Sequence, residues 1–414
     1  MIQTAEILTR TDFDGARLVD VDIFAQDFKR RPYAHFSRWT TEAPFYVEAG
    51  GAPQAVVARH SAVMRAFSDH EYFSSRKRPW PGMEKYAYFQ GLPVVADSDP
   101  PDHTRLRRLM TPAFTPRRIS AIEDGLALHV DAMLDRFETA GRFDAAIDYG
   151  RELAAHILFA LLLDLPQEAW PIFLRIAHAM STYNDLSAGD SPAAAFIDAW
   201  AEGRAYCEAM IDEQRRRPSD SVVAGIIDAH NEEGRITTDE LLATLFTLYI
   251  AGHGGIANTV AWTLLRLCQN PDQLDLLRRE PERIMAAVDE GIRHDPSGYH
   301  VLRFATHDFE FEGLRLWRDM PVLIISGAPN YDPARYPDPL RFDIAREGRR
   351  DITAFGYGVH HCIGMLLSRR IGRIAIEAPV RRFARLRLAD PGFEPGIVGG
   401  PKERGPDSVP LLIG

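Results

Sequence analysis

Cysteine is scarce in this chain, and basic residues are outnumbered by acidic ones. The three cysteines, Cys207, Cys268 and Cys362, lie far apart among 414 residues. They form neither a disulfide framework nor a C-x-x-C zinc pattern, so a reducing cytoplasm is the expected compartment. Lysine and arginine total 48 against 58 acidic residues, which gives a formal net charge of -10. This balance argues against nucleic acid as the main partner.

Long apolar runs are also missing. The first twenty residues, MIQTAEILTRTDFDGARLVD, contain early acidic residues and no apolar run of signal-peptide length. Nothing elsewhere approaches the ~20 apolar residues that span a bilayer. There is no internal repeat, low-complexity tract or obvious linker, and the glycines and prolines are scattered. We therefore expect one soluble domain over residues 1–414, with no membrane contact.

What is present is a mainly helical pattern with a small β portion. The stretch APFYVEAGGAPQAVVARH predicts two short strands around Gly50–Gly51. From Arg105 to about His230, apolar residues recur at helical spacing with breaks at prolines. Further strands are predicted in HVLRFATHDFEFEGLRL, MPVLIIS, ARLRLAD and SVPLLIG.

One predicted helix is unusually long. Thr237 and Glu240 form a capping-box pattern, and apolar residues then continue from Leu241 to about Cys268, before Asn270-Pro271. A helix of ~30 residues is ~45 Å long. Because it is apolar on most sides, we expect it to pass through the middle of the molecule.

The stretch AFGYGVHHCIGMLLSRR (354–370) places Cys362 among three glycines and directly after two histidines. A core thiol would not need the glycines. A zinc ligand would need three partners that this sequence does not space suitably, while a nucleophile could use one of the two histidines. A fourth interpretation explains more. Gly356 and Gly358 allow tight turns, and a helix that starts just after the sulfur would lower the thiol pKa, as suits an axial ligand of haem iron.

This stretch resembles the haem-binding loop of the cytochrome P450 monooxygenases, Phe-Gly-x-Gly-x-His-x-Cys-x-Gly. Every fixed position matches, namely Phe355, Gly356, Gly358, His360, Cys362 and Gly364. The resemblance implies the cytochrome P450 fold, with its long central helix crossing a haem b. It implies that Cys362 is the proximal iron ligand, that His360 contacts a propionate, and that Phe355 lies on the ring face beside the sulfur. Gly364 would let the flat ring approach closely.

The resemblance extends along nearly the whole chain. DPPDHTRLRRLMTPAFTPRR (99–118) is similar to the family segment in which His103 and Arg107 pair with haem propionates. The two side chains are four residues apart and share a helix face, and cations hold carboxylates by charge-assisted hydrogen bonds. Arg303, in HVLRFAT, stands where the family has a third propionate contact. Taken without the cysteine loop, the arginine run would be better explained as a solvated basic helix.

Glu290 and Arg293 match the family's Glu-x-x-Arg. On an exposed helix such a pair would contribute only ~0.3 kcal/mol. In the family the pair is buried and, with an arginine of the later YPDPLRFD stretch, fixes the loop that carries the cysteine. Arg341 is the best candidate for that arginine.

The long helix departs from the family at AGHGGIANT (251–259). The family has an acid and an alcohol where this chain has Gly254 and Gly255, and those two side chains relay protons to bound dioxygen. Two mid-helix glycines cost ~2 kcal/mol, so simple drift carries a penalty. Either ordered water or a polar substrate group carries the protons, with Asn258 and Thr259 as anchors, or the enzyme uses peroxide or one-electron coupling chemistry.

The resemblance also assigns a substrate pocket and an electron donor. The family's pocket segments supply an apolar, aromatic-rich set here: Trp80, Tyr86, Tyr88, Phe89, Leu92, Leu245, Tyr249, Val301 and Val398. The chain has no flavin or iron–sulfur segment, so a ferredoxin or flavodoxin with its reductase is the expected electron donor. Five arginines could form a basic landing site for it: Arg105, Arg108, Arg369, Arg370 and Arg373.

The expected activity is insertion of one oxygen atom from O2 into a small hydrophobic or aromatic substrate, by hydroxylation or O-dealkylation. Two alternatives remain open at this point. One is a peroxide-using or oxidative-coupling enzyme, and the other is a non-catalytic haem sensor, which only the glycine pair favours.

Overall fold

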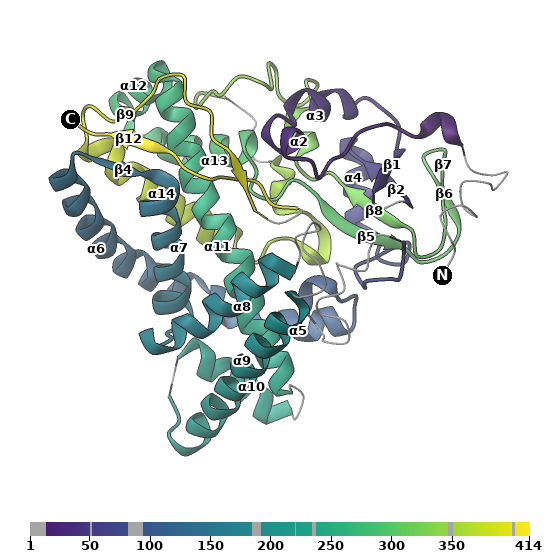
Figure 1. The fold of residues 1–414 in the computed structure, drawn as a ribbon, viewed down its shortest axis with the longest axis horizontal. Coiled ribbons are helices and arrows are strands. Elements are labelled where there is room, and N and C mark those ends of the chain that lie inside the picture. Colours follow the sequence, from purple (N-terminus) through teal and green to yellow (C-terminus); the bar gives the residue numbers. More distant parts are fainter. Residues whose placement is uncertain are drawn as a thin grey trace.

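A computed structural model describes residues 14–49, 52–81, 94–183, 192–219, 221–233, 237–346, 351–399 and 402–414. The chain is mainly helical with small sheets, as the sequence predicted (Figure 1). The helices are α2 (Gln26–Arg30), α3 (Tyr33–Trp39), α4 (His60–Ser68), α5 (Asp102–Met110), α6 (Pro116–Ala140), α7 (Glu152–His156), α8 (Trp170–Tyr183), α9 (Pro192–Arg216), α10 (Val222–Glu233), α11 (Thr238–Gln269), α12 (Pro271–Arg279), α13 (Ile284–His294) and α14 (Met365–Arg382).

The largest sheet has five strands and lies on the N-terminal side of the molecule, beside α2, α3 and α4 (Figure 1). Its order is β1 (Phe45–Ala49), β2 (Ala52–Val57), β8 (Pro321–Ile324), β5 (Val301–Ala305) and β3 (Phe73–Ser74). The predicted hairpin is confirmed, because β1 and β2 pair antiparallel with Phe45 opposite Val56. The two glycines predicted between them, Gly50–Gly51, lie outside the described residues.

Smaller sheets join segments that are far apart in sequence. A three-stranded sheet has the order β4 (Arg142–Asp144), β12 (Pro410–Leu412) and β9 (Arg387–Leu388). Two ribbons pair β10 (Ile397–Val398) with β11 (Gly405–Pro406), and β6 (Phe309–Phe311) with β7 (Leu314–Leu316). The strands that were predicted from the C-terminal stretches are therefore present, and β12 ties the end of the chain to the segment that follows α6.

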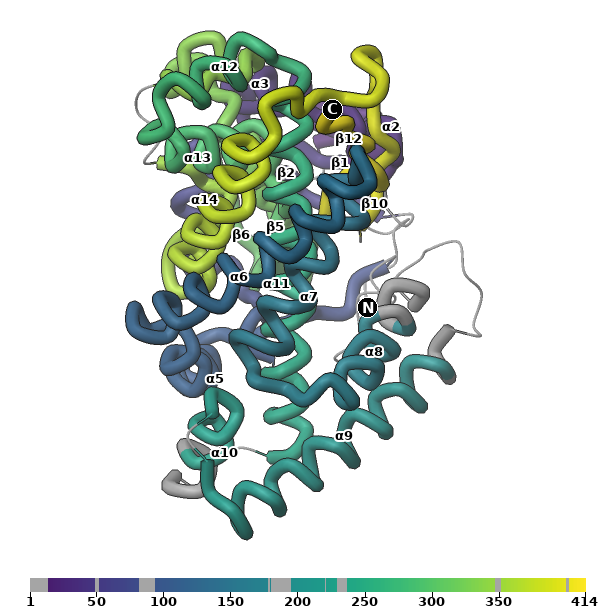
Figure 2. Tube along the Cα trace, turned by 90° about the vertical axis from the view of Figure 1, so that its left-hand side faces the viewer, coloured from purple at the N-terminus to yellow at the C-terminus, as the bar shows by residue number. Residues whose placement is uncertain are grey.

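The long helix α11 runs through the middle of the helical part, with α7 and α8 beside it (Figure 2). The predicted capping box is confirmed: Glu240 N donates to Thr237 Oγ1 over 3.2 Å, and Thr237 N donates to Glu240 Oε2 over 2.8 Å. Within the described residues, α11 is the one helix long and apolar enough to cross a membrane, contrary to our expectation of no such segment. However, 61% of its most apolar window is buried inside the protein, and burial accounts for that composition.

The core has one large apolar cluster and two smaller ones. The large cluster is built by α5 to α14 around α11, and includes the side chains of Phe246, Trp262 and Ile376. The smaller clusters lie on the two faces of the five-stranded sheet. The cysteine loop and α14 pack against the large cluster, so the loop is anchored to the helical part of the molecule.

Candidate active site

The loop before Cys362 is shaped by two glycines in left-handed conformation. Gly356 has φ 68° and Gly358 has φ 70°, which L side chains rarely adopt. At Gly358 a β-carbon would also lie 2.9 Å from the carbonyl oxygen of Phe67. The amide of Cys362 donates to the carbonyl of Phe355 over 2.9 Å and closes the loop. The backbone path therefore requires both glycines.

The sulfur of Cys362 lies just before α14, which begins at Met365. Its side chain is accessible, and the backbone N–H groups of Gly364 and Met365 donate to the sulfur. We expected a lowered thiol pKa. In the protein alone the pKa of Cys362 is raised, because neighbouring protein atoms displace part of the water around the sulfur and this effect outweighs the two amides and nearby Arg107. Coordination to a metal ion reverses this balance, since a coordinating thiol is deprotonated outright.

Basic side chains converge beside this loop from two elements. His103 and Arg107 lie on α5, and Arg303 lies on β5. The His103 and His360 rings have their centroids 4.1 Å apart, and Arg107 Nη2 donates to the carbonyl of His361 over 2.6 Å. The structure thus brings together the predicted residues His103, Arg107 and His360. The charge of Arg303 lowers the pKa of both His103 and His360, so Arg303 lies close enough to act on both rings.

Negative charge compensates this cluster only in part, because Asp97 and Asp99 act on Arg303 and Asp99 also acts on His103. Burial lowers the pKa of Arg303 to about 10, and burial together with the cations Arg303, His103 and Arg107 lowers the pKa of His360 to about 2. In the part of the chain that the structure describes, neither Arg107 nor Arg303 has an ion-pair partner. Both ring nitrogens of His103 are buried without a hydrogen-bond partner. Such groups call for an anionic ligand.

These residues fit a haem. Cys362 offers an accessible sulfur for the iron, and the basic cluster offers donors for two propionates. A β-carbon at Gly364 would lie 3.9 Å from the sulfur and 3.8 Å from Phe114, which is ordinary contact. The surrounding protein therefore does not itself demand glycine at 364, whereas a flat ring held against the sulfur would.

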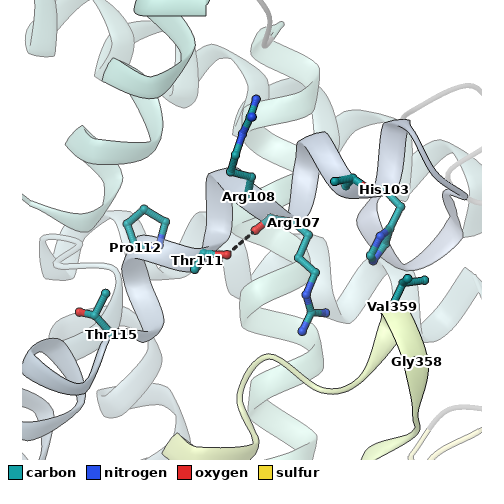
Figure 3. A pocket seen from close by; sticks show the side chains of 9 residues that line it. His103, Arg107, Arg108, Thr111, Pro112, Thr115, Gly358 and Val359 are labelled. Carbon is teal, nitrogen blue, oxygen red and sulfur yellow. Dashed lines mark hydrogen bonds between the residues drawn. The ribbon is translucent and has the colours of Figure 1, made fainter.

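A recess of about 780 Å³ opens between α5 and the cysteine loop (Figure 3). In Figure 3 the side chains of His103 and Arg107 point from α5 toward the part of the cysteine loop that carries Gly358 and Val359. Arg107 is kept on α5 in a regular turn, because Thr111 Oγ1 donates to its carbonyl over 2.9 Å. The recess reaches the basic cluster from outside.

A buried ion pair supports the loop from the far side. Glu290 and Arg293 on α13 have fully buried side chains and form a two-bond pair, with distances of 2.7 and 2.9 Å. Our choice of Arg341 as the third member is wrong. The side chain of Arg346 reaches Glu290 over 3.3 Å, while Arg341 is exposed and contributes only its backbone carbonyl, which accepts from Arg293 and Arg346.

Asn330 connects the buried ion pair to the cysteine loop by hydrogen bonds. Arg293 Nη1 donates to the Asn330 carbonyl over 2.9 Å, and the Asn330 Oδ1 atom accepts from the Thr353 amide over 3.0 Å. Thr353 Oγ1 also donates to the carbonyl of Ser326 over 2.6 Å. Since Thr353 begins the short turn that leads to Phe355, the buried pair and the cysteine loop form one hydrogen-bonded unit.

The glycine pair lies where α11 becomes accessible. Ala251 is exposed and Gly254 and Gly255 are partly exposed, although most of this helix is buried. Asn258 Nδ2 donates to Ser297 Oγ over 2.9 Å, and Thr259 Oγ1 donates to the Gly255 carbonyl over 2.7 Å. Asn258 and Thr259, which we predicted to anchor water, therefore already donate these hydrogen bonds to protein groups.

Several predicted substrate residues are committed to packing instead. Trp80 is buried in the sheet core with its indole N–H on the Pro53 carbonyl, and Leu245 is fully buried. Tyr249 stacks on Phe159 with ring centroids 4.4 Å apart. We correct these three assignments: the sequence did not reveal how α11 is rotated, which decides Leu245 and Tyr249, nor that Trp80 packs into the sheet core. Val301 and Val398 remain partly accessible, whereas Tyr86, Tyr88, Phe89 and Leu92 lie outside the described residues.

The predicted basic landing site is largely neutralised. Arg105 pairs with Glu240 over 2.5 Å and Arg369 with Asp289 over 2.7 Å. Arg370 and Arg373 share Glu123, at 2.9 and 3.2 Å. Four of the five arginines therefore have acidic partners, and the expected patch of excess positive charge is corrected to a mixed surface.

Together, the α-helical fold and the cysteine loop define a haem-thiolate protein. Residues 193–390 match the family model described as Cytochrome P450. The chain is 30% identical to the cytochrome P450 monooxygenase PikC of Streptomyces venezuelae, covering 95% of this chain and 94% of that protein. It is 28% identical to 6-deoxyerythronolide B hydroxylase of Saccharopolyspora erythraea, covering 89% of this chain and 92% of that protein.

Among solved structures, the crystal structure of CalO2 is similar, with a TM-score of 0.86 at 29% identity over 95% of this chain and 99% of that chain. The chain belongs to the cytochrome P450 family. It is a bacterial-type P450 monooxygenase, and members of the family bind haem b with a cysteine thiolate as iron ligand.

Replacing Arg303 with methionine should have opposite effects on the two forms of the protein. The apoprotein should become more resistant to urea, because a buried charge that forms no ion pair is removed. Haem affinity should fall about tenfold or more, because a charge-assisted hydrogen bond is lost. Urea unfolding and Soret titration measure the two effects, with exposed Arg318→Met as control. Lower apoprotein stability together with unchanged haem affinity would contradict a propionate role.

Proposed function

We propose that this P450 inserts one oxygen atom from O2 into a small hydrophobic or aromatic substrate, by hydroxylation or O-dealkylation. We further propose that it acts in the cytoplasm as one domain over residues 1–414. The observation that carries the proposal is the accessible sulfur of Cys362 beside a basic cluster in which the buried His103 ring has no hydrogen-bond partner. The accessible apolar side chains of Ala251, Val301 and Val398 support an apolar substrate.

Each group of residues at the site would have a separate role in binding the haem. When bound, haem supplies the oxygen-activating chemistry, so that one oxygen atom enters the substrate and the other leaves as water. Cys362, held by the amides of Gly364 and Met365, would donate sulfur to the iron. The basic cluster of His103, Arg107, Arg303 and His360 would hold the propionates, with Phe355 against the ring beside the sulfur. The Glu290–Arg293–Arg346 unit would keep the loop in register.

Electrons would come from a ferredoxin or flavodoxin with its reductase. The exposed apolar side chains of Tyr357, Val359 and Leu366 surround the cysteine loop, and Arg108 is exposed beside the recess. An apolar centre with a polar rim suits a protein partner. Because neighbouring arginines are paired with acids, we expect apolar contact at the loop to matter more than net charge.

The glycine pair favours a second candidate. Gly254 and Gly255 remove both side chains that relay protons in the family, so α11 itself offers no side-chain proton donor at this turn. A peroxide-using or oxidative-coupling enzyme would not need such a relay. This candidate differs from monooxygenation in the source of oxygen and in the need for a reductase.

Labelled dioxygen separates the two candidates. Compounds that shift the Soret band of the holoenzyme are first selected, then turned over with NAD(P)H, reductase and donor under isotopically labelled O2. We expect one labelled oxygen atom in a hydroxylated product, or in the carbonyl fragment of an O-dealkylated one, whose alcohol fragment keeps the unlabelled ether oxygen. Product that forms only with peroxide, or a coupled product that contains no label, would contradict the proposed function.

A further inference from the structure

Gly254 lies beside a carboxylate that comes from a distant part of the chain. A β-carbon on residue 254 would be 3.1 Å from Oε2 of Glu403 and 3.4 Å from its Cδ. An aspartate at 254 would therefore need the space that the Glu403 carboxyl group occupies. Gly255 differs, because a β-carbon there would meet no atom within 4 Å. Packing against Glu403 thus accounts for the first glycine and leaves the second open.

The segment that carries Glu403 is firmly held next to α11. Gly298 and Glu403 form an antiparallel β-bridge, and Arg404 N donates to the Ser297 carbonyl over 2.7 Å. The buried guanidinium of Arg404 also donates to Asp295 over 2.6 Å. These bonds join the residues after α13 to the C-terminal segment, so the position of Glu403 is set by two backbone contacts and one buried ion pair.

Both segments meet α11 within one turn of the glycine pair. Ser297 Oγ donates to the Gly254 carbonyl over 3.2 Å and accepts from Asn258 Nδ2 over 2.9 Å. Gly405 is needed for this approach, because a β-carbon there would lie 2.1 Å from Asn258 Oδ1. The Glu403 carboxyl group, the Ser297 hydroxyl and the Gly254 carbonyl therefore lie together where α11 is accessible.

We propose that Glu403 is the proton-donating carboxyl group at this turn, supplied by the C-terminal segment in place of the acid that α11 lacks at 254. The role rests on the proposed function: putting one atom of O2 into the substrate and releasing the other as water consumes two electrons, from the donor protein, and two protons. Glu403 gives a proton toward the accessible face of α11 and regains one from solvent, since its side chain is partly exposed.

The electrostatic surroundings suit this role. Burial raises the pKa of the Glu403 carboxyl group, although Lys402 and Lys29 pull it down. A raised pKa enlarges the protonated fraction near neutral pH. His253, next to Gly254 in sequence, does not compete as a proton donor, because burial and Arg151 lower its pKa to about 4. Its ring packs near the Tyr249 ring, with centroids 5.4 Å apart.

The first test does not depend on turnover. Infrared titration of the holoenzyme should show a carboxylic-acid C=O band that disappears as pH rises, at a pH above the range of exposed glutamates. The band should be missing in Glu403→Gln and in Glu403→Ala, and should return in Glu403→Ala combined with Gly254→Asp, where the alanine vacates the space. Gly254→Asp alone should lower the urea midpoint more than it does in the Glu403→Ala background, since only in the former do two side chains compete for one space. No Glu403-dependent band, or equal effects of Gly254→Asp in both backgrounds, overturns the proposal.

The second test measures coupling with labelled O2. At full haem content, Glu403→Gln should lower the rate of product formation roughly 100-fold and divert electrons to hydrogen peroxide. Glu403→Ala combined with Gly254→Asp should restore at least a tenth of the wild-type product per NAD(P)H, and exposed Asp407→Asn should change nothing. Labelled product formed equally well by Glu403→Gln overturns the role of Glu403 alone. A wild-type enzyme that forms no labelled product overturns the proposed function, and this role with it.

Discussion

Replacing Glu290 with alanine should leave a protein that cannot retain haem. Glu290 and Arg293 are fully buried, and the same carboxylate also accepts from Arg346 and from the backbone amide of Asp343 over 2.9 Å. Removing one partner of a buried ion pair costs about 3–5 kcal/mol, because the remaining charge is left uncompensated. That loss is a large part of the 5–15 kcal/mol typical of a folded domain.

The effect should reach the cysteine loop through Asn330 and Thr353. We expect the purified Glu290→Ala protein to have a low ratio of Soret to protein absorbance and a lower urea midpoint. Arg341→Ala is the matched control, because that exposed side chain makes none of these bonds and only its carbonyl does. Equal damage from the two substitutions would contradict the arrangement of Arg346, and normal haem content in Glu290→Ala would contradict the structural link.

Replacing Cys362 with serine should abolish the spectrum of a haem-thiolate protein. Serine keeps nearly the same size and can accept hydrogen bonds from the amides of Gly364 and Met365, but it is a far poorer ligand for iron than a thiolate. With dithionite and carbon monoxide, the wild type should give the red-shifted Soret band of thiolate ligation. The variant should bind less haem and lack that band.

The other two cysteines provide controls for this substitution. Cys207 is buried, and burial raises the pKa values of both Cys207 and Cys268 to about 12, so neither thiol is poised to ionise. Cys268→Ser should keep the wild-type carbon monoxide spectrum. The same red-shifted band in Cys362→Ser, or its loss in Cys268→Ser, would count against Cys362 as the ligand.

Local patterns made much of this molecule predictable. The capping box at Thr237 and Glu240 locates the start of α11, because its two hydrogen bonds involve residues three apart. Gly356 and Gly358 predicted tight turns for a similar local reason, and each has a positive φ in the structure. The alternation and turn residues around Gly50–Gly51 likewise predicted β1 and β2, which depend mainly on each other.

Features that depend on long-range geometry were less accessible. Arg341 and Arg346 lie in one irregular stretch, and only its folded path decides which guanidinium turns inward to Glu290. The rotation of α11 decides that Tyr249 faces Phe159, because an evenly apolar helix has no clear polar side from which to judge. The net pKa of Cys362 depends on burial, which the loop sequence does not reveal.

Glu403 was missed for the same reason. It is about 150 positions from Gly254 in the sequence, and no spacing rule connects a short C-terminal β-bridge to the middle of a helix. The only sequence signal was negative, a pair of glycines where helix stability favours other residues. A missing side chain at such a position suggests looking for a group from another segment that fills the space.

Iron-edge X-ray absorption of the purified holoenzyme tests the central claim most directly, because it reports which atoms lie next to the metal. The wild type should show one sulfur neighbour together with the four porphyrin nitrogens, and the sulfur should vanish in Cys362→Ser while remaining in Cys268→Ser. If the iron of the wild type has only nitrogen and oxygen neighbours, the sulfur of Cys362 is not bound to iron, and the assignment of Cys362 as the haem ligand is contradicted.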